Sequence, residues 1–288
     1  MFKSYVKYIA ALLLFGSNGL VSSFISLDSS EIVFLRSSIG AVLLLALFFI
    51  SGRRITAFHY KKDLLFIILS GIAMGGEWLF LFEAYARIGV SLGILINYTG
   101  PAIVIALSPF LFKEHISAAK LTALFAALAG VILISGQGLT SGINAIGLMC
   151  AGISAVGYSV MVLSIKMVKN VDSTESAVLQ LAAGAVFVLL VRLFSGNIMI
   201  NITVSDWLPV LWLGLINTGL GCFLYFSSMK GLPAQSIAVC GYIEPLSGVL
   251  MSVIFLNEQM TLLQAAGAVL IIGGAVFGEL AGRKRIAV

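Results

Sequence analysis

Residues 28–52 read DSSEIVFLRSSIGAVLLLALFFISG, and residues 172–196 read DSTESAVLQLAAGAVFVLLVRLFSG. The two stretches lie 144 positions apart, half the length of the 288-residue chain, and 10 of their 25 positions are identical without a gap. The same shift pairs further identical residues: Tyr98 with Tyr242, Pro101 with Pro245, Ser108 with Ser252, Glu114 with Glu258 and Gly130 with Gly274. The sequence therefore predicts an internal duplication, with one repeat over residues 1–144 and a second over residues 145–288.

The composition is that of a membrane protein. Hydrophobic residues make up 60% of the chain, charged residues 10%, and the mean hydropathy is +1.11, whereas a soluble domain carries about 25% charged residues. Apolar runs of about 20 residues, enough to cross a bilayer, recur along the whole length. They are residues 6–26, 31–50, 64–86, 89–112, 117–135, 145–165, 175–194, 207–228, 233–255 and 262–281. We predict an all-α polytopic membrane protein with ten transmembrane helices, five in each repeat.

The basic residues indicate how each repeat is oriented. Because five is odd, the second repeat must enter the membrane from the side opposite to the first. The loop over residues 51–63, SGRRITAFHYKKD, has four Lys or Arg residues, and its counterpart over residues 195–207, SGNIMINITVSDW, has none. With both termini in the cytoplasm, 14 of the 17 Lys and Arg residues fall on the cytoplasmic side, where such residues collect. We expect inverted repeats in the inner or plasma membrane, and the scattered bases do not indicate nucleic-acid binding.

Two of the acids inside predicted spans are candidates for function, because an ionisable residue there is costly and faces a cavity or a partner. Glu244 directly precedes Pro245, which removes a backbone hydrogen bond and exposes carbonyls suited to a cation or an ammonium group. The alternative is a structural acid paired with Arg36. Glu77, beside Trp78, is a candidate proton carrier or a protonated hydrogen-bond donor between helices. Both acids are candidate substrate-binding residues.

Neutral polar and aromatic residues also punctuate the spans. They are Asn18, Trp78, Asn97, Tyr98, Tyr158, Asn217, Tyr225 and Tyr242. An aromatic ring with a hydroxyl group suits an organic ligand, and hydrogen bonding between helices explains the same residues equally well. Apart from Asn217, we include them with Glu77 and Glu244 among the candidate substrate-binding residues.

Several of these features resemble the drug/metabolite transporter superfamily, specifically its EamA-like family. The resemblance rests on the residues around Arg36, on Pro101 with Glu114, and on Pro245 with Glu258. It implies two inverted five-helix repeats around a central cavity that opens alternately to each side. It also implies structural or gating roles for Arg36, Pro101, Pro245, Glu114 and Glu258. The family handles amino acids, nucleotide sugars, amines and other metabolites, so the resemblance leaves the substrate open.

We therefore expect a secondary transporter of small organic metabolites, exporting amino acids or related compounds by alternating access. The alternatives are a channel or receptor-like membrane protein and an intramembrane enzyme. The two histidines, His59 and His115, lie in predicted loops, and no metal-binding or nucleotide-binding motif is present in the sequence. We expect no catalytic residue, metal or cofactor, and the expected partners are a small-molecule substrate and the lipid bilayer. The protein is expected to be a monomer or a homodimer.

Overall fold

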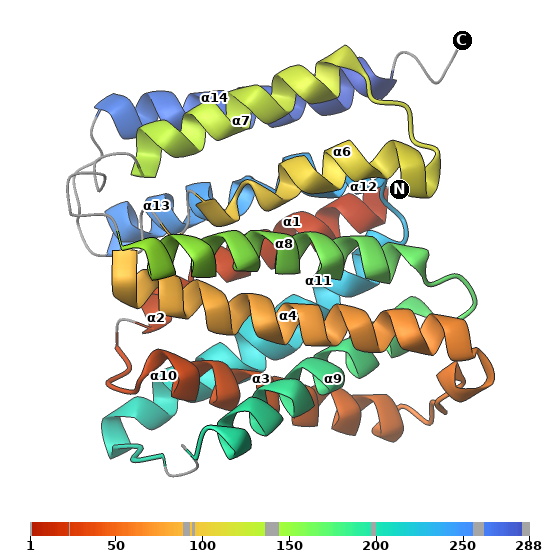
Figure 1. Ribbon diagram of the computed structural model, residues 1–288, viewed down its shortest axis with the longest axis vertical. Helices are drawn as coiled ribbons and strands as arrows, with labels where there is room; N and C mark the ends of the chain where they lie inside the picture. Colours follow the sequence, from red (N-terminus) through yellow and green to blue (C-terminus); the bar gives the residue numbers. More distant parts are fainter. Residues whose placement is uncertain are drawn as a thin grey trace.

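The computed structural model describes residues 2–22, 24–88, 93, 96–135, 144–196, 200–255 and 262–283, and in these residues all regular structure is helical. The long helices lie side by side across the view in Figure 1. Helices α7 (Ala118–Ser135) and α14 (Leu262–Arg283) pack against each other at one edge of the molecule, and α3 (Ser29–Ile50) and α9 (Ser173–Phe194) lie near the opposite edge. The predicted polytopic, all-α fold is confirmed.

The described helices form ten segments, in the order that the sequence predicts. The first repeat contains α1 (Phe2–Gly16) with α2 (Asn18–Ser22), then α3, α4 (Lys61–Ile88), α6 (Gly100–Phe112) and α7. The second contains α8 (Ala145–Met167), α9, a composite of α10 (Trp207–Leu211), the π-helix η4 (Trp212–Leu220) and α11 (Gly221–Met229), then α12 (Ala234–Gly241) with α13 (Ile243–Phe255), and α14. Two short 3-10 turns, η1 (Ala57–His59) and η3 (Val204–Asp206), precede α4 and α10.

Within the described residues, six segments are long and apolar enough to cross a membrane, and three apolar helices are shorter: 100–112, 118–133 and 265–278. The first segment begins at Phe2, four residues before the predicted start. The lysines in this stretch do not end the helix, because a lysine's aliphatic stem can lie along apolar surface while its ammonium group reaches the lipid headgroups. The Lys7 ammonium also lies 6.0 Å from the centre of the Phe223 ring.

The duplication is visible in the ends of α3 and α9. Each helix follows an N-cap aspartate, Asp28 or Asp172, and each has a C-cap serine whose hydroxyl donates to a carbonyl four residues earlier. The next residue in each case is a glycine with positive φ, 70° at Gly52 and 72° at Gly196. Side chains rarely adopt this left-handed backbone, so glycine is the residue that ends both helices. The two helices therefore start and stop 144 residues apart.

These matched helices run antiparallel, as an inverted repeat requires. The end of α3 meets the start of α9, where an Arg53 Nη lies 3.0 Å from a carboxylate oxygen of Asp172. At their other ends, Arg192 near the end of α9 lies 3.9 Å from Glu31 in the first turn of α3. Both pairs join one repeat to the other.

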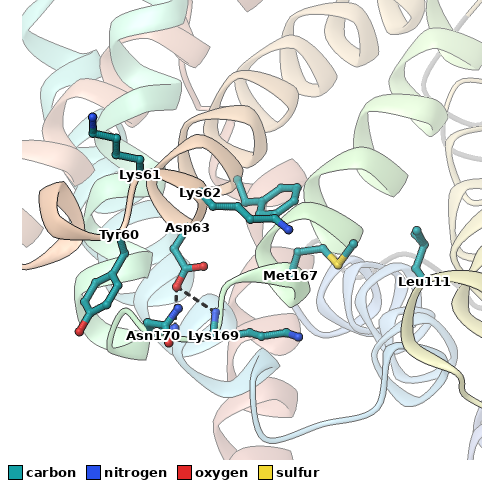
Figure 2. A pocket seen from close by; sticks show the side chains of 9 residues that line it. Tyr60, Lys61, Lys62, Asp63, Leu111, Met167, Lys169 and Asn170 are labelled. Carbon is teal, nitrogen blue, oxygen red and sulfur yellow. Dashed lines mark hydrogen bonds between the residues drawn. The ribbon is translucent and has the colours of Figure 1, made fainter.

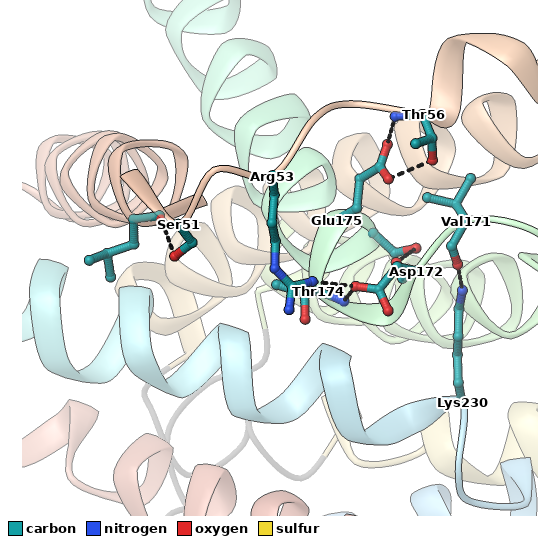
Figure 3. A network of polar contacts seen from close by, with 10 residues as sticks. Ser51, Arg53, Thr56, Val171, Asp172, Thr174, Glu175 and Lys230 are labelled. Atoms are coloured by element: carbon teal, nitrogen blue, oxygen red, sulfur yellow. Dashed lines mark hydrogen bonds and ion pairs between the residues drawn. The ribbon is translucent and has the colours of Figure 1, made fainter. Parts of the chain in front are cut away.

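The basic loops gather at one end of the molecule, around Glu175 (Figure 3). The Glu175 side chain is 3% exposed and accepts hydrogen bonds from the Thr56 N–H (2.6 Å), the Thr56 hydroxyl (2.8 Å) and the Ala57 N–H (2.7 Å). The Lys230 ammonium donates to the Val171 carbonyl. The buried Glu175 carboxylate thus ties α9 to the loop before α4 and has the partners a buried charge needs, and the separate Lys230 bond adds a third segment to this end of the molecule.

Asp172 lies beside this network and outside the spans. Partial burial raises the pKa of its carboxyl, but hydrogen bonds from the Thr174 and Glu175 backbone, together with the charge of Arg53, outweigh that effect. The pKa of Asp172 therefore lies below its ordinary value.

Close helix approaches occur at small residues. A Cβ added to Gly71 in α4 would lie 2.4 Å from the Gln180 carbonyl of α9, and one added to Gly278 in α14 would lie 2.6 Å from the Cβ of Ala123 in α7. Because lipid does not drive apolar helices together, close backbone contact at small residues is what holds such pairs.

Candidate functional site

The fourth and ninth segments are broken near the middle of the molecule. α12 ends at Gly241, Tyr242 forms a turn, and α13 begins at Ile243, with Pro245 in its first turn. In the first repeat, Tyr98 and Thr99 form a turn, and Pro101 follows at the start of α6. A proline has no backbone N–H, and the N–H groups in the first turn of a helix have no acceptor within that helix, so a proline fits there. Pro101 and Pro245 therefore start the second half of each broken segment and do not lie inside a continuous helix.

The two breaks touch each other through Tyr98 and Tyr242. The Tyr242 hydroxyl donates a 2.8 Å hydrogen bond to the Tyr98 carbonyl, and the two ring centres lie 5.6 Å apart. Tyr242 is fully buried and Tyr98 is half-buried. The contact brings a pair of equivalent residues together where the two repeats meet.

Arg36 is buried in the interior. Its side chain is 4% exposed, its Nε donates to the Thr218 hydroxyl at 2.9 Å, and its guanidinium lies 4.4 Å from the centre of the Trp78 ring. Thr218 belongs to η4 of the second repeat and Trp78 to α4 of the first. The ring face and the hydroxyl thus stabilise a buried cation between the repeats.

Two acids share this interior with Arg36. Glu77 is 7% exposed and Glu244 is half-buried, and each interacts electrostatically with Arg36 and with the other acid. Among the residues that the structure describes, no ion pair within 4.0 Å joins Arg36 to either carboxyl group. The three groups therefore face a common region without neutralising one another by direct contact.

Asn97 connects this group to α8. Its carboxamide lies beside the Glu77 carboxyl, and its Nδ2 donates to the Ser154 hydroxyl at 2.8 Å. α8 itself passes close to Glu77, because a Cβ added to Gly157 would lie 3.2 Å from the Glu77 Cβ. Glu77 is consequently held by neighbours on two sides.

A cluster of tyrosines lies next to the acids. Tyr8 and Tyr225 stack with ring centres 4.9 Å apart, and the Tyr8 hydroxyl donates to the Ile237 carbonyl at 2.9 Å. Tyr158 lies next to Tyr225, and all three tyrosines interact electrostatically with Glu244. They come from α1, α8 and α11, so both repeats contribute.

Sequence reasoning missed Tyr8, Tyr85, Thr218 and Cys222, all of which lie near Arg36 or the acids. Tyr8 could have been found from its spacing, because it shares a helix face with the buried residues Ala11 and Leu12. Nothing in the local sequence of Cys222 indicates the nearby guanidinium of Arg36.

Other predicted residues lie elsewhere. Asn18 lies at the break in the first segment and pairs with Asn217. Glu114 accepts hydrogen bonds from the N–H groups of Ala234 (2.9 Å) and Gln235 (3.3 Å), so it caps the start of α12 from the opposite repeat. Its counterpart Glu258 lies outside the described residues. Among those that are described, no group of three or more His, Cys, Asp or Glu residues could hold a metal ion.

A cavity of about 400 Å³ lies at the end of the molecule that carries the basic loops, near the ends of α4, α6 and α8 (Figure 2). Its wall combines Lys61, Lys62 and Lys169 with the apolar side chains of Phe66, Leu111 and Met167. Asp63 lies in the same wall and accepts hydrogen bonds from the N–H groups of Lys169 (3.1 Å) and Asn170 (2.5 Å). This carboxylate ties the start of α4 to the α8–α9 connection of the other repeat.

Comparison with known proteins supports the resemblance seen in the sequence. The sequence model of the EamA-like transporter family matches residues 3–136 and again residues 145–278. A solved crystal structure shares the fold, with a TM-score of 0.83 over 97% of this chain and 98% of that chain, at 22% identity.

Curated relatives include three bacterial proteins that match over most of their length. The chain is 24% identical over 272 residues to the Uncharacterized transporter YxxF of Bacillus subtilis (strain 168), which covers 93% of this chain and 87% of that protein. It is 27% identical over 288 residues to YetK of the same organism, also named an uncharacterized transporter, with coverages of 94% and 85%. Protein PecM of Dickeya dadantii (strain 3937) is 23% identical over 212 residues, with coverages of 73% and 71%.

Proposed function

Because this chain belongs to the EamA-like transporter family, we propose that it is a secondary transporter that exports amino acids or closely related zwitterionic metabolites. The family and the relatives' names support a multi-pass membrane transporter. We place it in the inner or plasma membrane with both termini in the cytoplasm, because that orientation puts most Lys and Arg residues on the cytoplasmic side.

The observation that supports a zwitterionic substrate is the arrangement of Arg36, Glu77 and Glu244. One guanidinium and two carboxyl groups interact across the same region, yet no direct ion pair joins Arg36 to either acid among the described residues. Buried charges are stable only when they are paired. A substrate with an ammonium and a carboxylate group would complete both pairings, with its ammonium toward Glu244 and Glu77 and its carboxylate toward Arg36.

The aromatic neighbours favour an organic substrate over an inorganic ion. The Trp78 ring lies against the Arg36 guanidinium, and Tyr98, which packs against Tyr242, interacts electrostatically with Glu244. Aromatic rings suit an apolar side chain or an ammonium group. Asn97 holds Glu77, and Tyr158 and Tyr225 lie beside Glu244. We infer that these residues bind the substrate together.

We infer alternating access, and the inverted repeats support it. Two halves of similar structure and opposite orientation can exchange their conformations, which closes the site on one side and opens it on the other. The contact between Tyr98 and Tyr242 lies at the breaks of equivalent segments, where a small rotation of one repeat against the other would be absorbed.

A binding screen followed by counterflow tests this proposal. Purified protein should be stabilised against heat by amino acids, and less by amines or carboxylates that carry only one of the two charges. Proteoliposomes should then show saturable counterflow of the stabilising compound. Flux that does not saturate would indicate a channel, and stabilisation by simple amines equal to that by amino acids would exclude Arg36 as a carboxylate partner.

A further inference from the structure

The cavity at the end of the molecule that carries the basic loops takes no part in the proposed substrate site. It has a volume of about 400 Å³ and is lined by the start of α4, the end of α6, the end of α8 and the connection that follows α8. Because α4 and α6 belong to the first repeat and α8 to the second, both repeats contribute to its wall. Ligand pockets in proteins commonly have volumes of about 300–1,000 Å³, so the cavity is large enough for a small ligand or a lipid headgroup.

The charged side chains of the wall are mostly basic, and two of them point into the cavity. Lys61, Lys62 and Lys169 share the wall with a single acid, Asp63. Figure 2 shows Lys62 and Lys169 extending toward Met167, whereas the Lys61 side chain points away. Lys62 lies in α4 and Lys169 follows α8, so an anion held between their ammonium groups would contact both repeats.

The ammonium groups of Lys62 and Lys169 are available to a ligand. Neither forms a hydrogen bond or an ion pair with any residue in the described part of the chain. Asp63 does not neutralise them, because its carboxylate accepts two backbone N–H groups of the α8–α9 connection, at 3.1 and 2.5 Å. The cavity therefore has more positive charge than the protein itself balances.

Other basic side chains at this end are engaged by the protein. Arg53 pairs with Asp172 at 3.0 Å, and the Lys230 ammonium donates to the Val171 carbonyl. These cations hold segments of the chain together. The two lysines that point into the cavity hold no segment in this way.

The rest of the cavity wall is apolar and continues onto exposed surface. Phe66, Leu111 and Met167 complete the wall described above. Leu111 is 41% exposed, and Phe110 beside it in α6 is 84% exposed. Exposed apolar surface of this kind is typical of a membrane contact. A ligand could therefore place a charged group between the lysines and an apolar chain along α6.

The equivalent place in the second repeat lacks these cations. Under the shift of 144 residues, the three lysines of the wall correspond to Ser205, Asp206 and Ile25. The same fold is thus built at the opposite end of the molecule without any of them, so the fold does not require the lysines.

We propose that this cavity binds the headgroup of an anionic phospholipid of the cytoplasmic leaflet, with its phosphate between Lys62 and Lys169 and its acyl chains along α6. Basic pockets between transmembrane helices on the cytoplasmic side are suited to anionic headgroups. The apolar part of the wall favours a lipid over a free phosphate compound. The choice of leaflet rests on the proposed orientation of the transporter, whereas binding of the lipid itself does not.

Binding is measured first in micelles of a neutral detergent. The purified protein is heated with increasing amounts of dioleoyl phosphatidylglycerol, of dioleoyl phosphatidylcholine or of glycerol 3-phosphate. We expect saturable stabilisation by phosphatidylglycerol, with one molecule retained per chain in native mass spectrometry. Equal stabilisation by the two lipids would show that the negative charge is not recognised and would overturn the proposal. No amino acid is present, so each outcome leaves the proposed function standing.

Variants then locate the lipid. In Lys62→Gln, Lys169→Gln, the affinity for phosphatidylglycerol should fall about fivefold for each lysine removed, the equivalent of about 1 kcal/mol. The matched control is Arg54→Gln, Lys61→Gln, which removes the same charge from the same end of the molecule. Arg54 is exposed and lies outside the cavity wall, and Lys61 points away from the cavity. An equal loss in both double variants would indicate diffuse attraction and contradict the site.

The same variants separate a lipid from a soluble ligand. Stabilisation by glycerol 3-phosphate as strong as that by the lipid, and lost in Lys62→Gln, Lys169→Gln, would assign the cavity to a soluble phosphate compound and overturn the lipid proposal. Both lysines are exposed, so we expect the variant to fold, and its unfolding temperature in phosphatidylcholine checks this. Should it not fold, Leu111→Glu places an acid in the apolar wall and must weaken binding of phosphatidylglycerol. Unchanged affinity in that variant would rule out the site.

Discussion

The Tyr242 hydroxyl donates a hydrogen bond to the Tyr98 carbonyl at 2.8 Å, and these two residues are equivalent under the shift of 144 that relates the repeats. Equivalent residues of two related halves can touch only close to the axis that relates them. The contact therefore lies close to the axis between the two repeats. Arg36, Glu77 and Glu244 interact electrostatically beside it, which places the charged groups where neither repeat alone could form the site.

The Tyr242 hydroxyl should contribute measurably to stability. Tyr242→Phe removes one buried hydrogen bond and keeps the ring, so we expect the free energy of unfolding to fall by about 1 kcal/mol. Tyr98→Phe is the control, because Tyr98 supplies its backbone carbonyl to this bond and the substitution leaves that carbonyl in place. Reversible denaturation in mixed micelles measures both. Equal losses in the two variants would show that the hydrogen bond contributes nothing specific.

Glu244→Gln should lower transport much more than it lowers the yield of folded protein. The substitution keeps the shape of the side chain and removes the charge that we assign to the substrate ammonium. We expect kcat/KM for counterflow to fall at least about tenfold, the equivalent of about 1.4 kcal/mol. Glu83→Gln is the matched control, since Glu83 forms an exposed ion pair with Arg87 at 2.6 Å. Normal transport by Glu244→Gln in proteoliposomes would make this acid a packing residue.

At the end of the molecule that carries the basic loops, the buried Glu175 carboxylate should contribute more to the free energy of unfolding than the exposed ion pair of Arg53 and Asp172. Glu175→Gln replaces the carboxylate that accepts three hydrogen bonds, and a lost charge-assisted network of this kind costs about 2–4 kcal/mol. Arg53→Gln breaks a pair whose side chains are 50% and 57% exposed, and such pairs contribute about 0–1 kcal/mol. Thermal unfolding of both variants tests which substitution lowers stability more. A larger loss of stability in Arg53→Gln would contradict the prediction.

The proposed orientation is tested by labelling from one side of the membrane. Phe58, beside the basic loop, is 65% exposed, and Val204, in the matched loop of the second repeat, is 91% exposed. We expect Phe58→Cys to react with an impermeant maleimide only from the cytoplasm and Val204→Cys only from outside. The native Cys150, Cys222 and Cys240 are all buried and serve as the background signal. Labelling of both positions from the same side would contradict the inverted arrangement.

The ends of α3 and α9 were predictable because their signals are local. An N-cap aspartate, an apolar run and a Ser-Gly pair appear in the sequence of each helix, and the structure places both within two residues of the predicted bounds. The break at Ser17 was not predicted, and in the ninth segment the sequence indicated an interruption at Pro245 but not the turn at Tyr242. Hydropathy averaged over a span is insensitive to one turn residue, and what supports each break is a partner in the other repeat, Asn217 in one case and Tyr98 in the other.

The candidate site was predicted by residue type but not by arrangement. Glu77, Glu244 and the tyrosines stand out because polar groups in an apolar span are costly. The sequence leaves open whether Arg36 reaches the surface, since an arginine six residues from a predicted helix end can do so. Its neighbours Thr218 and Trp78 lie on other helices, one of them in the other repeat, so only the fold reveals that it is held inside.

Two carboxylates that join the repeats at opposite ends should control which side of the transporter opens. Asp63 accepts the N–H groups of Lys169 and Asn170, and Asp206 accepts the N–H (2.9 Å) and hydroxyl (2.8 Å) of Ser26. Ser26 and Asn170 are 144 residues apart, which is the shift that relates the repeats. Asp63 and Asp206 are 143 residues apart, one residue fewer. The interlocks are therefore equivalent, one at each face. Removing one weakens closure at its own end only.

The native Cys222 is buried beside Arg36. In a background of Cys150→Ala and Cys240→Ala, its labelling measures the opening of the transporter to each side. Asp63→Ala should increase its labelling by an impermeant maleimide from the cytoplasm, and Asp206→Ala should increase it from outside. A shift of about 1 kcal/mol in the conformational equilibrium changes the population of the open state about fivefold, so labelling rates should change by a similar factor. Increased labelling from the same side in both variants, or from both sides in either, would mean that these carboxylates hold the fold together and do not select its conformation.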